Sequence, residues 1–487
     1  MAEGELKDRT AKGLFWGGLS NGLLQVISLV FGIIIGRILD PSDFGVIGVL
    51  TIFTAVATAM QESGFTAALI NRKKVDPADY DSVFWFNVLL SLILYLILFF
   101  CAPLIARFFH NAELVALSRF TFLGFLIGSF GTAQNAWLVK QMKIKEKSIA
   151  SIVSVVVAGV VAVVLALKGF SYWGIAVQNI VMMAVNTLGL WIASSWRPSF
   201  RISFKPVGEM LGFSFKVLIT NVFAIINFHF FSVVFGRFYS EKEVGIYNQA
   251  NKWNSAGYSV VNGMAYNVAQ PMLVEAAGDD GRQVRVFRKL MRFVAFVSFP
   301  LMFGLSLVAP EFITSLLTDK WLESGRLLRI LCIGGSVYPV TTVMVQLILS
   351  HGGSGVQMWN NIAIGLAQLA VCALLFPFGV TWMVVAYTVV NCLWIFIWLG
   401  CVNRYISYPL KDFLTDILPY ASLSALVMVS TYFITIFIHD PRWLCLARIA
   451  VAVLIYSGVV WLSGSEIFKE CIQFARERMQ VIFRRKG

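Results

Sequence analysis

The sequence is poor in charged residues and lacks the common motifs for nucleotide hydrolysis and zinc-dependent catalysis. Only 13% of its 487 residues are charged, while 58% are hydrophobic, a composition that excludes a soluble globular protein of this length. No strict alternation of apolar and polar residues runs along the chain, which argues against an outer-membrane barrel. Walker A and HExxH sequences are both missing.

Cysteine occurs without the spacing of a metal site. Most of the cysteines lie in apolar segments, so we interpret them as small core or lipid-facing residues and predict no disulfide, no metal and no other cofactor. The stretch GLSNG at 18–22 fits the nucleophile-elbow pattern. It lies in an apolar helix with no preceding strand, so it does not indicate a hydrolase. The seven cysteines are at positions 101, 332, 372, 392, 401, 445 and 471.

Apolar runs are abundant, and many approach the length of about twenty residues that crosses a bilayer. We count about fourteen such spans and therefore predict an all-α integral membrane protein. The predicted spans are 14–36, 44–65, 82–106, 114–138, 149–168, 172–194, 210–236, 244–270, 289–309, 326–350, 356–376, 380–402, 412–438 and 443–463.

The formal net charge of +13 is distributed over alternate short loops instead of one basic domain. We therefore predict no nucleic-acid partner. With the N-terminus in the cytoplasm, the even-numbered connections contain most of the cations, which is the positive-inside pattern. Both termini are predicted to be cytoplasmic, and the tail at 465–487 is predicted to lie along the membrane surface as an amphipathic helix.

A stretch after the first predicted span occurs again after the seventh, 200 residues further on. The shared positions are Gly36, Arg37 and Gly45 in the first copy and Gly236, Arg237 and Gly245 in the second. We expect a tight turn between two helices, where the arginine suits the last carbonyls of the preceding helix. Each arginine alone is explained as well by snorkelling to the interface, but the two copies together indicate two related halves.

Each copy also contains residues that suit the start of the next helix. In the first copy we expect Asp40 to cap, with Pro41 at the first helical position. In the second, Ser240 and Glu243 have the spacing of a capping box.

Six predicted spans lie between the two copies, so the chain returns to the same side of the membrane. The halves are therefore expected to be parallel repeats, each a lobe of six helices, with two extra helices. The predicted domains are an N-terminal lobe at 1–200, a C-terminal lobe at 201–405, the extra helices at 406–464 and the tail at 465–487.

Three stretches resemble the polysaccharide transporters, the Wzx-type O-antigen and capsule flippases of the MOP superfamily: DPSDFG at 40–45, VGIYNQA at 244–250 and FPLM at 299–302. The resemblance implies a carrier that moves an undecaprenyl-diphosphate-linked oligosaccharide across a bacterial inner membrane by alternating access. Such carriers supply lipopolysaccharide, capsule and exopolysaccharide synthesis. The expected partners are lipid-linked oligosaccharide, membrane lipids and other polysaccharide-assembly proteins. The family pattern offers no catalytic motif, so a transporter is expected and not an enzyme.

A diphosphate with its sugars needs a path with cations, neutral hydrogen-bonding groups and few acids. The candidate cations within or just inside predicted spans are Arg119, Lys216, Lys252 and Arg326. A cation at the centre of a membrane helix costs about 2.5 to 3.5 kcal/mol on insertion scales, so each residue needs an anion or water. Snorkelling to the interface is the alternative explanation.

Amides crowd the seventh and eighth predicted spans, and sugar hydroxyls need amide partners. The substrate-path candidates among them are Asn221, Asn227, Gln249 and Asn251. Hydrogen bonds between helices explain any single amide equally well. The aromatic residues nearby that could stack on sugar rings are Tyr247, Trp253, Tyr258 and Tyr266.

Two titratable residues inside spans, Glu62 and His229, are candidates for binding a coupling proton or Na+. The alternative for both is a satisfied buried polar group. Coupling is not required on energetic grounds. With the cell interior negative, carrying phosphate charges outward is downhill by about 2.3 kcal/mol per charge per 100 mV.

Two other functions stay open on the sequence alone. A drug/cation antiporter of the MATE type is the nearer one, but its cationic cargo favours buried acids. A membrane glycan polymerase or glycosyltransferase is expected to have a sizeable loop outside the membrane, or a cluster of acids or histidines at one face. The sequence contains neither.

Overall fold

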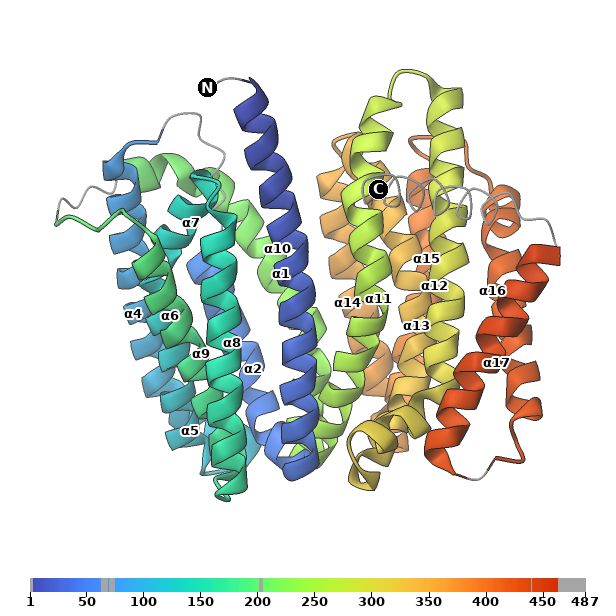
Figure 1. The fold of residues 1–487 in the computed structure, drawn as a ribbon, viewed down its shortest axis with the longest axis horizontal. Helices are drawn as coiled ribbons and strands as arrows, with labels where there is room; N and C mark the ends of the chain where they lie inside the picture. Colours follow the sequence, from blue (N-terminus) through green and yellow to red (C-terminus); the bar gives the residue numbers. More distant parts are fainter. Residues whose placement is uncertain (1–2, 63–68, 70–74, 201–204, 439, 463–487) are drawn as a thin grey trace, which may run out of the picture. The chain divides into compact units, whose positions relative to one another are not determined.

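The computed structural model describes residues 3–62, 69, 75–200, 205–438 and 440–462. Within these ranges the side chains of residues 3–15, 17, 18, 62, 205–221 and 280 are not described. The described residues form helices and no strand (Figure 1). The chain divides into two compact units, residues 1–248 (unit 1) and residues 249–487 (unit 2).

The helices follow one another along the chain with short connections. In unit 1 they are α1 (Glu3–Ile38), α2 (Pro41–Glu62), α4 (Pro77–Phe109), α5 (Leu114–Thr121), α6 (Leu123–Ser129), α7 (Thr132–Lys140), α8 (Ile144–Leu167), α9 (Ser171–Ala193) and α10 (Lys205–Phe238). The next helix, α11 (Glu241–Glu275), begins in unit 1 and continues into unit 2. Unit 2 continues with α12 (Asp280–Leu316), η1 (Asp319–Trp321), α13 (Leu322–Ser350), α14 (Ser354–Leu375), η2 (Phe376–Phe378), α15 (Val380–Val402), α16 (Leu410–Ile434) and α17 (Pro441–Leu462).

All of the predicted spans are helical. Each coincides with one helix, except that the span predicted at 114–138 is divided among α5, α6 and α7. Twelve stretches of the described residues are long and apolar enough to cross a membrane. The two predicted spans outside this set lie in α10, of which Val222–Phe238 is the apolar stretch, and in α11, which is rich in amides. The chain is a multi-pass helical membrane protein.

The division at 248 follows from packing. In unit 1, α10 lies against α2 and α4, and the first turns of α11 continue this packing. The predicted lobe boundaries at 200 and 405 stay a prediction.

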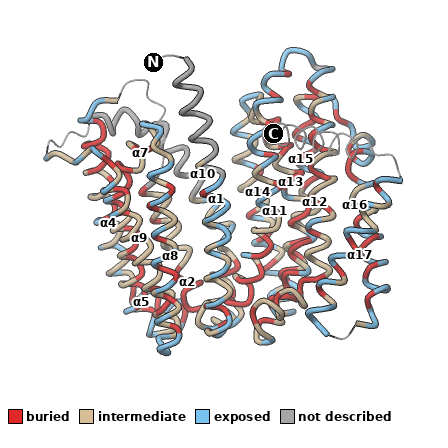
Figure 2. The backbone as a smooth tube through the Cα atoms, in the orientation of Figure 1, coloured by how far each residue is buried: buried red, intermediate tan, exposed pale blue. Residues whose placement is uncertain are grey.

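Buried and exposed residues alternate along the described helices (Figure 2), and many of the exposed ones are large apolar residues. In α8 the buried face consists of Ala158, Ala162 and Ala166, at steps of four residues, while Val153 and Val160 are exposed. Small residues at this spacing let helices approach closely, and exposed valines are stable where the surroundings are lipid.

The span predicted as one helix at 114–138 is broken twice. At the second break, between α6 and α7, two carbonyl groups accept hydrogen bonds from side chains of α9. The hydroxyl of Thr187 donates to the carbonyl of Ile127 (3.3 Å), and the indole N–H of Trp191 donates to that of Phe130 (2.7 Å). Backbone breaks at membrane depth are stable only where protein groups replace the lost bonds.

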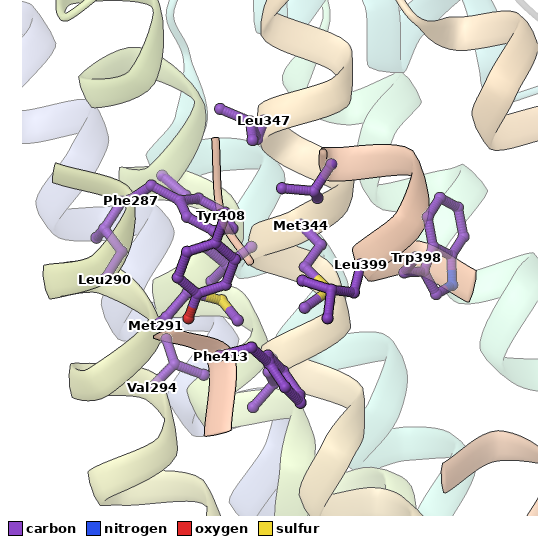
Figure 3. Close-up of a cluster of buried hydrophobic side chains, with 14 of the residues drawn as sticks. Phe287, Leu290, Met291, Val294, Met344, Leu347, Trp398, Leu399, Tyr408 and Phe413 are labelled. Atoms are coloured by element: carbon purple, nitrogen blue, oxygen red, sulfur yellow. The ribbon is translucent and has the colours of Figure 1, made fainter. Parts of the chain in front are cut away.

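The core of unit 2 lies between α12, α13 and α15 (Figure 3). Its members are almost completely buried. They include Phe287, Leu290, Met291 and Val294 of α12, Met344 and Leu347 of α13, Trp398 and Leu399 of α15, and Tyr408 and Phe413 beyond α15.

A buried carboxylate fastens α16 to α12. Asp416 has no exposed side-chain surface and accepts from Nε of Arg288 (2.9 Å) and Nε of Arg292 (2.5 Å). The hydroxyl of Tyr408 donates to the same carboxylate (3.1 Å). Burial raises the pKa of the Tyr408 phenol and the carboxylate of Asp416 raises it further, so the phenol stays a donor. A buried charge is stable only when paired and hydrogen-bonded in this way.

A second buried pair fastens α17 to α12. The guanidinium of Arg448 lies 2.8 Å from a carboxylate oxygen of Glu311, and the two side chains are 5% and 17% exposed. Arg448 also donates to the carbonyl of Leu307 (3.3 Å). Between the two ionic contacts the Tyr456 hydroxyl of α17 donates to the carbonyl of Phe296 (3.0 Å). The two extra helices are therefore bound to a single helix of the unit by ionic and polar contacts.

Candidate functional site

The two copies of the repeated turn lie against each other in unit 1. A Cβ atom added to Gly45 would lie 1.6 Å from the backbone oxygen of Glu241, and one added to Gly245 would lie 1.8 Å from that of Pro41. Since 41 and 241 are equivalent positions in the repeat, the contact is reciprocal. Only glycine allows such an approach of two backbones. The sequence predicted the turns but not that they touch.

The caps differ between the copies. In the first copy the backbone N–H of Asp40 donates to the Asp43 carboxylate (3.0 Å), and in the second the N–H of Glu243 donates to the Ser240 hydroxyl (3.3 Å). These are the two halves of a capping box. The predicted role of Ser240 is confirmed. In the first copy the carboxylate of Asp43 takes part in the cap, and the capping role expected of the Asp40 side chain stays a prediction.

Each copy is also tied to another connection of unit 1. The Ser171 hydroxyl at the start of α9 donates to Asp43, and the Asn111 amide donates to Glu241 (2.9 Å). Arg237 donates to the carbonyl of Phe108 (2.6 Å), in the last turn of α4. The arginine was expected to serve the end of its own helix, but this bond goes to the end of a neighbouring helix, where the dipole favours it equally.

Arg119 lies in α5 and is ordered against α4. Its guanidinium carbon lies 4.2 Å from the ring centroid of Phe99, and its Nε donates to the Phe99 carbonyl (3.3 Å). A cation over an aromatic face is partly desolvated without an anion. Its role in a substrate path stays a prediction.

The other candidate cations have different surroundings. Arg326 lies in the second turn of α13 and pairs with Glu323 (2.6 Å), with more than half of each side chain exposed, which favours an ordinary surface pair. Lys252 lies in α11 with an exposed side chain. The side chain of Lys216 lies outside the described residues. Arg119 belongs to unit 1 and Arg326 to unit 2, and the joint path predicted for them stays a prediction.

The predicted amides are also distributed unequally. Gln249 is buried, and Asn251 and Asn227 are half-buried; the side chain of Asn221 lies outside the described residues. Of the predicted aromatics, Tyr247 is buried in a cluster with Phe231, so it is not free to stack on a ligand.

Polar residues of α11 form a continuous arc on the part of the helix that belongs to unit 2. At 3.6 residues per turn, Asn254, Tyr258 and Asn262 follow one another on one side of the helix, and Ser259 and Lys252 lie further round, where both are exposed. From Val244 to Val274 the helix contains no acid and a single cation, Lys252. The arc is therefore neutral where it is packed and positive where it is exposed.

The arc continues onto α13 and α15 in a set of six residues that we call the tyrosine–amide cluster. Its members are Tyr258 and Asn262 of α11, Tyr338 and Thr342 of α13, and Tyr387 and Asn391 of α15. On each helix a tyrosine is followed four residues later by an amide or a hydroxyl, so both lie on the same face.

Direct contacts join the α11 and α13 members of this cluster. The rings of Tyr258 and Tyr338 are 4.7 Å apart at 34°, and the Thr342 hydroxyl donates to the Asn262 amide oxygen (2.5 Å). Tyr387 and Asn391 lie on α15, which packs against α13, and the Asn391 amide donates to the carbonyl of Tyr387 (2.9 Å).

Sequence reasoning missed most of the cluster. Of its six members, it had singled out Tyr258 for stacking and Asn262 only as one of many amides in α11. The repeated spacing Tyr-x-x-x-Asn/Thr at 258, 338 and 387 was the available signal.

The structure adds little evidence about the two ion-coupling candidates. The side chain of Glu62 lies outside the described residues. His229 is half-buried in α10, 5.0 Å from the ring of Phe228 beside it. Among the residues that the structure describes, no three His, Cys, Asp or Glu side chains are placed to hold a metal ion.

The helices are those of a multi-pass membrane protein, and one of them carries an arc of uncharged hydrogen-bonding groups with a single lysine. The chain belongs to the family of polysaccharide biosynthesis proteins, whose model matches residues 34–326. It is 24% identical over 479 residues to the succinoglycan biosynthesis transport protein ExoT of Rhizobium meliloti (strain 1021), covering 95% of each chain. This confirms the resemblance identified in the sequence.

Two further relatives are similar over somewhat less of the chain. The teichuronic acid biosynthesis protein TuaB of Bacillus subtilis (strain 168) is 24% identical, over 82% of this chain and 86% of the relative. The lipopolysaccharide biosynthesis protein WzxC of Escherichia coli (strain K12) is 24% identical, over 73% of each.

Solved structures show the same fold. The lipid II flippase MurJ in its inward closed conformation superposes with a TM-score of 0.76 at 16% identity, covering 94% of this chain and 100% of that one. An inward-facing MATE family transporter of the MOP superfamily gives 0.64 at 17% identity, covering 79% and 94%. The MOP-type fold predicted from the sequence is confirmed.

Proposed function

We propose that this protein is a flippase that moves an undecaprenyl-diphosphate-linked oligosaccharide from the inner to the outer leaflet of a bacterial inner membrane. Its relatives are named for succinoglycan transport, teichuronic acid biosynthesis and lipopolysaccharide biosynthesis. All three names refer to polymers built from sugars. The protein acts as a transporter and not as an enzyme, by alternating access, with both termini in the cytoplasm.

The observation that carries the proposal is the polar arc of α11. It offers amides and phenols to sugar hydroxyls and a lysine to a phosphate, and from Val244 to Val274 it contains no acid to repel the anion. In a membrane interior a charged side chain is retained where a ligand or water compensates it. Lys252 is therefore the cation that we assign to the diphosphate.

Transport of purified protein in proteoliposomes tests the proposal. Lipid-linked oligosaccharide is placed in the membrane, and the sugar that appears on the opposite leaflet is measured with a membrane-impermeant lectin. We expect wild-type protein to expose the sugar, Lys252→Ala to slow the rate at least tenfold and Lys252→Arg to retain most of it. Absence of flipping by the wild-type protein would contradict the proposal.

The same vesicles distinguish a flippase from the alternative function, a MATE-type antiporter. A MATE-type antiporter would expel a cationic dye such as ethidium against a proton or Na+ gradient. Dye transport without movement of lipid-linked sugar would identify an antiporter.

Membrane potential is the proposed driving force. Two phosphate charges moving outward gain about 2.3 kcal/mol per charge per 100 mV. A potassium diffusion potential, negative on the side from which the sugar departs, should accelerate flipping, and reversal should slow it. Rates that are independent of potential but require a proton or Na+ gradient would favour ion coupling through Glu62 or His229.

A further inference from the structure

The tyrosine–amide cluster of unit 2 has the chemistry of a site for a neutral sugar ring. A pyranose has apolar C–H faces that pack on aromatic rings, and a rim of hydroxyls that need donors and acceptors together. The cluster provides three phenols for the faces, and the amides of Asn262 and Asn391 for the rim. Amides both donate and accept, so they suit hydroxyls better than either charge does.

The cluster is partly open. Tyr338 is stacked on Tyr258, yet 51% of its surface is exposed. It lies near the middle of α13 (Leu322–Ser350), far from both ends. Lipid-facing tyrosines gather at the membrane interface, where the phenol reaches water. An exposed phenol in the middle of a membrane helix is instead expected to face a polar space.

A buried acceptor lies next to the stacked pair. Asn254, one turn before Tyr258 on α11, is 6% exposed, and its amide oxygen has no hydrogen-bond partner among the described residues. Leaving such an atom unpaired costs about 1 to 3 kcal/mol. The oxygen is closed off against Gly335 of α13, so a ligand hydroxyl can satisfy it only after α11 and α13 move apart. The amide oxygen of Asn391, by contrast, accepts from Gln368 of α14 (3.3 Å) and is held in place.

The cluster does not fit the other parts of the cargo. None of its six members is an acid, a lysine, an arginine or a histidine, so it offers no charge to a diphosphate. A polyprenyl tail would leave its amides and phenols unpaired. Lys252 lies on the same helix but further round, on the exposed side, so phosphate and sugar can be held by adjacent parts of one arc.

We infer that the tyrosine–amide cluster is the sugar subsite of the carrier, with Tyr338 and Tyr258 as the stacking platform. The inference rests on the proposed function and deepens it. It predicts that the first sugars of the repeat unit are recognised in unit 2, and that Tyr338 discriminates cargo with sugars from the bare lipid diphosphate.

Binding to the full-length protein in nanodiscs tests the inference with two probes. One is undecaprenyl diphosphate without sugar, and the other is undecaprenyl-diphosphate-linked oligosaccharide extracted from the native host. We expect Tyr338→Leu to weaken binding of the sugar-bearing lipid at least tenfold while binding of undecaprenyl diphosphate changes less than twofold. Tyr338→Phe, which keeps the ring, should lose less than threefold. Trp382→Leu, at an exposed aromatic of α15 in the same unit, is the matched control and should alter neither.

The outcomes separate the two proposals. If wild-type protein binds and flips the sugar-bearing lipid and Tyr338→Leu still binds it normally, the subsite is wrong and the flippase stands. If Tyr338→Leu weakens both probes equally, the tyrosine supports the fold and the subsite is again wrong. If wild-type protein neither binds nor flips the sugar-bearing lipid, the proposed function itself fails. Tyr338→Trp is the control for misfolding. It also changes the residue at position 338 but supplies a larger ring, so it should retain or strengthen selective binding.

Discussion

The repeated turns of unit 1 and the extra helices of unit 2 are held by different kinds of interaction. In unit 1 the repeated turns meet backbone to backbone at Gly45 and Gly245. In unit 2 the extra helices α16 and α17 are joined to α12 by buried ion pairs of Asp416 and Glu311. A neutral contact between backbones can separate without exposing an unpaired charge. A buried ion pair cannot, because the buried carboxylate that is left behind loses both water and partner.

The difference indicates which contact is permanent. We expect α16 and α17 to stay on α12 through a transport cycle. The glycine contact in unit 1 is the one that can open and close at low cost. Four substitutions test this comparison.

The largest expected effect is that of Asp416→Asn. It removes the fully buried charge that Arg288 and Arg292 share, although these two side chains are themselves 26% and 39% exposed. Breaking a buried pair typically costs about 3 to 5 kcal/mol. Unfolding in mixed micelles should show this loss of free energy. Asp412→Asn, whose carboxylate is 34% exposed and pairs with Arg288 at 3.2 Å, is the control and should cost much less. Equal effects of the two would show that burial does not govern this attachment.

Next comes Arg448→Met, which leaves the carboxylate of Glu311 without its cation. We expect a loss of about 3 kcal/mol on the same reasoning. The double variant Glu311→Gln with Arg448→Met should regain most of it, because a buried pair replaced by neutral groups is often near neutral. Additive losses in the double variant, measured by the same unfolding assay, would contradict a direct pairing.

In unit 1, Gly45→Ala should act on transport more than on stability. The new methyl group overlaps the carbonyl of Glu241, and overpacking of this kind costs about 1 to 3 kcal/mol. This overlap raises the free energy of the state in which the turns touch. Flipping should therefore slow at least fivefold while the protein stays folded. Gly245→Ala should do the same. Gly263→Ala, where the methyl group meets nothing within 4 Å, should leave transport unchanged and add about 1 kcal/mol of helix stability.

The smallest effect should come from the cap. Ser240→Ala removes the acceptor of the Glu243 N–H, and loss of an N-cap costs about 1 kcal/mol. Ser240→Asn keeps an acceptor and should be close to wild type. Thermal unfolding measures both, and a loss above that of Arg448→Met would reverse the ranking between the units.

The sequence predicted the twelve stretches that are long and apolar enough to cross a membrane, because twenty-residue apolar runs depend only on local composition. It could not predict the breaks in 114–138, since the apolar run continues through them and the compensating donors, Thr187 and Trp191, come from a different helix. It identified the repeated glycines as parts of turns. Their contact with each other is tertiary, and nothing local encodes it.

The sequence drew attention to α11 but not to the residues that pack against it. The amides and Lys252 are close together in the sequence, so the high number of polar residues in this one helix could be recognised without a structure. The cluster with Tyr338 and Asn391 required knowledge of which helices are neighbours. In the same way, Arg448 could not be matched from spacing alone with Glu311, its partner on a helix far earlier in the chain.

The broken span has an implication for how the family diverges. Two carbonyls of its backbone accept hydrogen bonds from the side chains at positions 187 and 191 of another helix. The shape of this segment therefore depends partly on the sequence of that helix. Relatives that keep the breaks should keep a hydroxyl, amide or indole at those two places even where everything around them has drifted. Relatives with a continuous helix there should be released from that requirement.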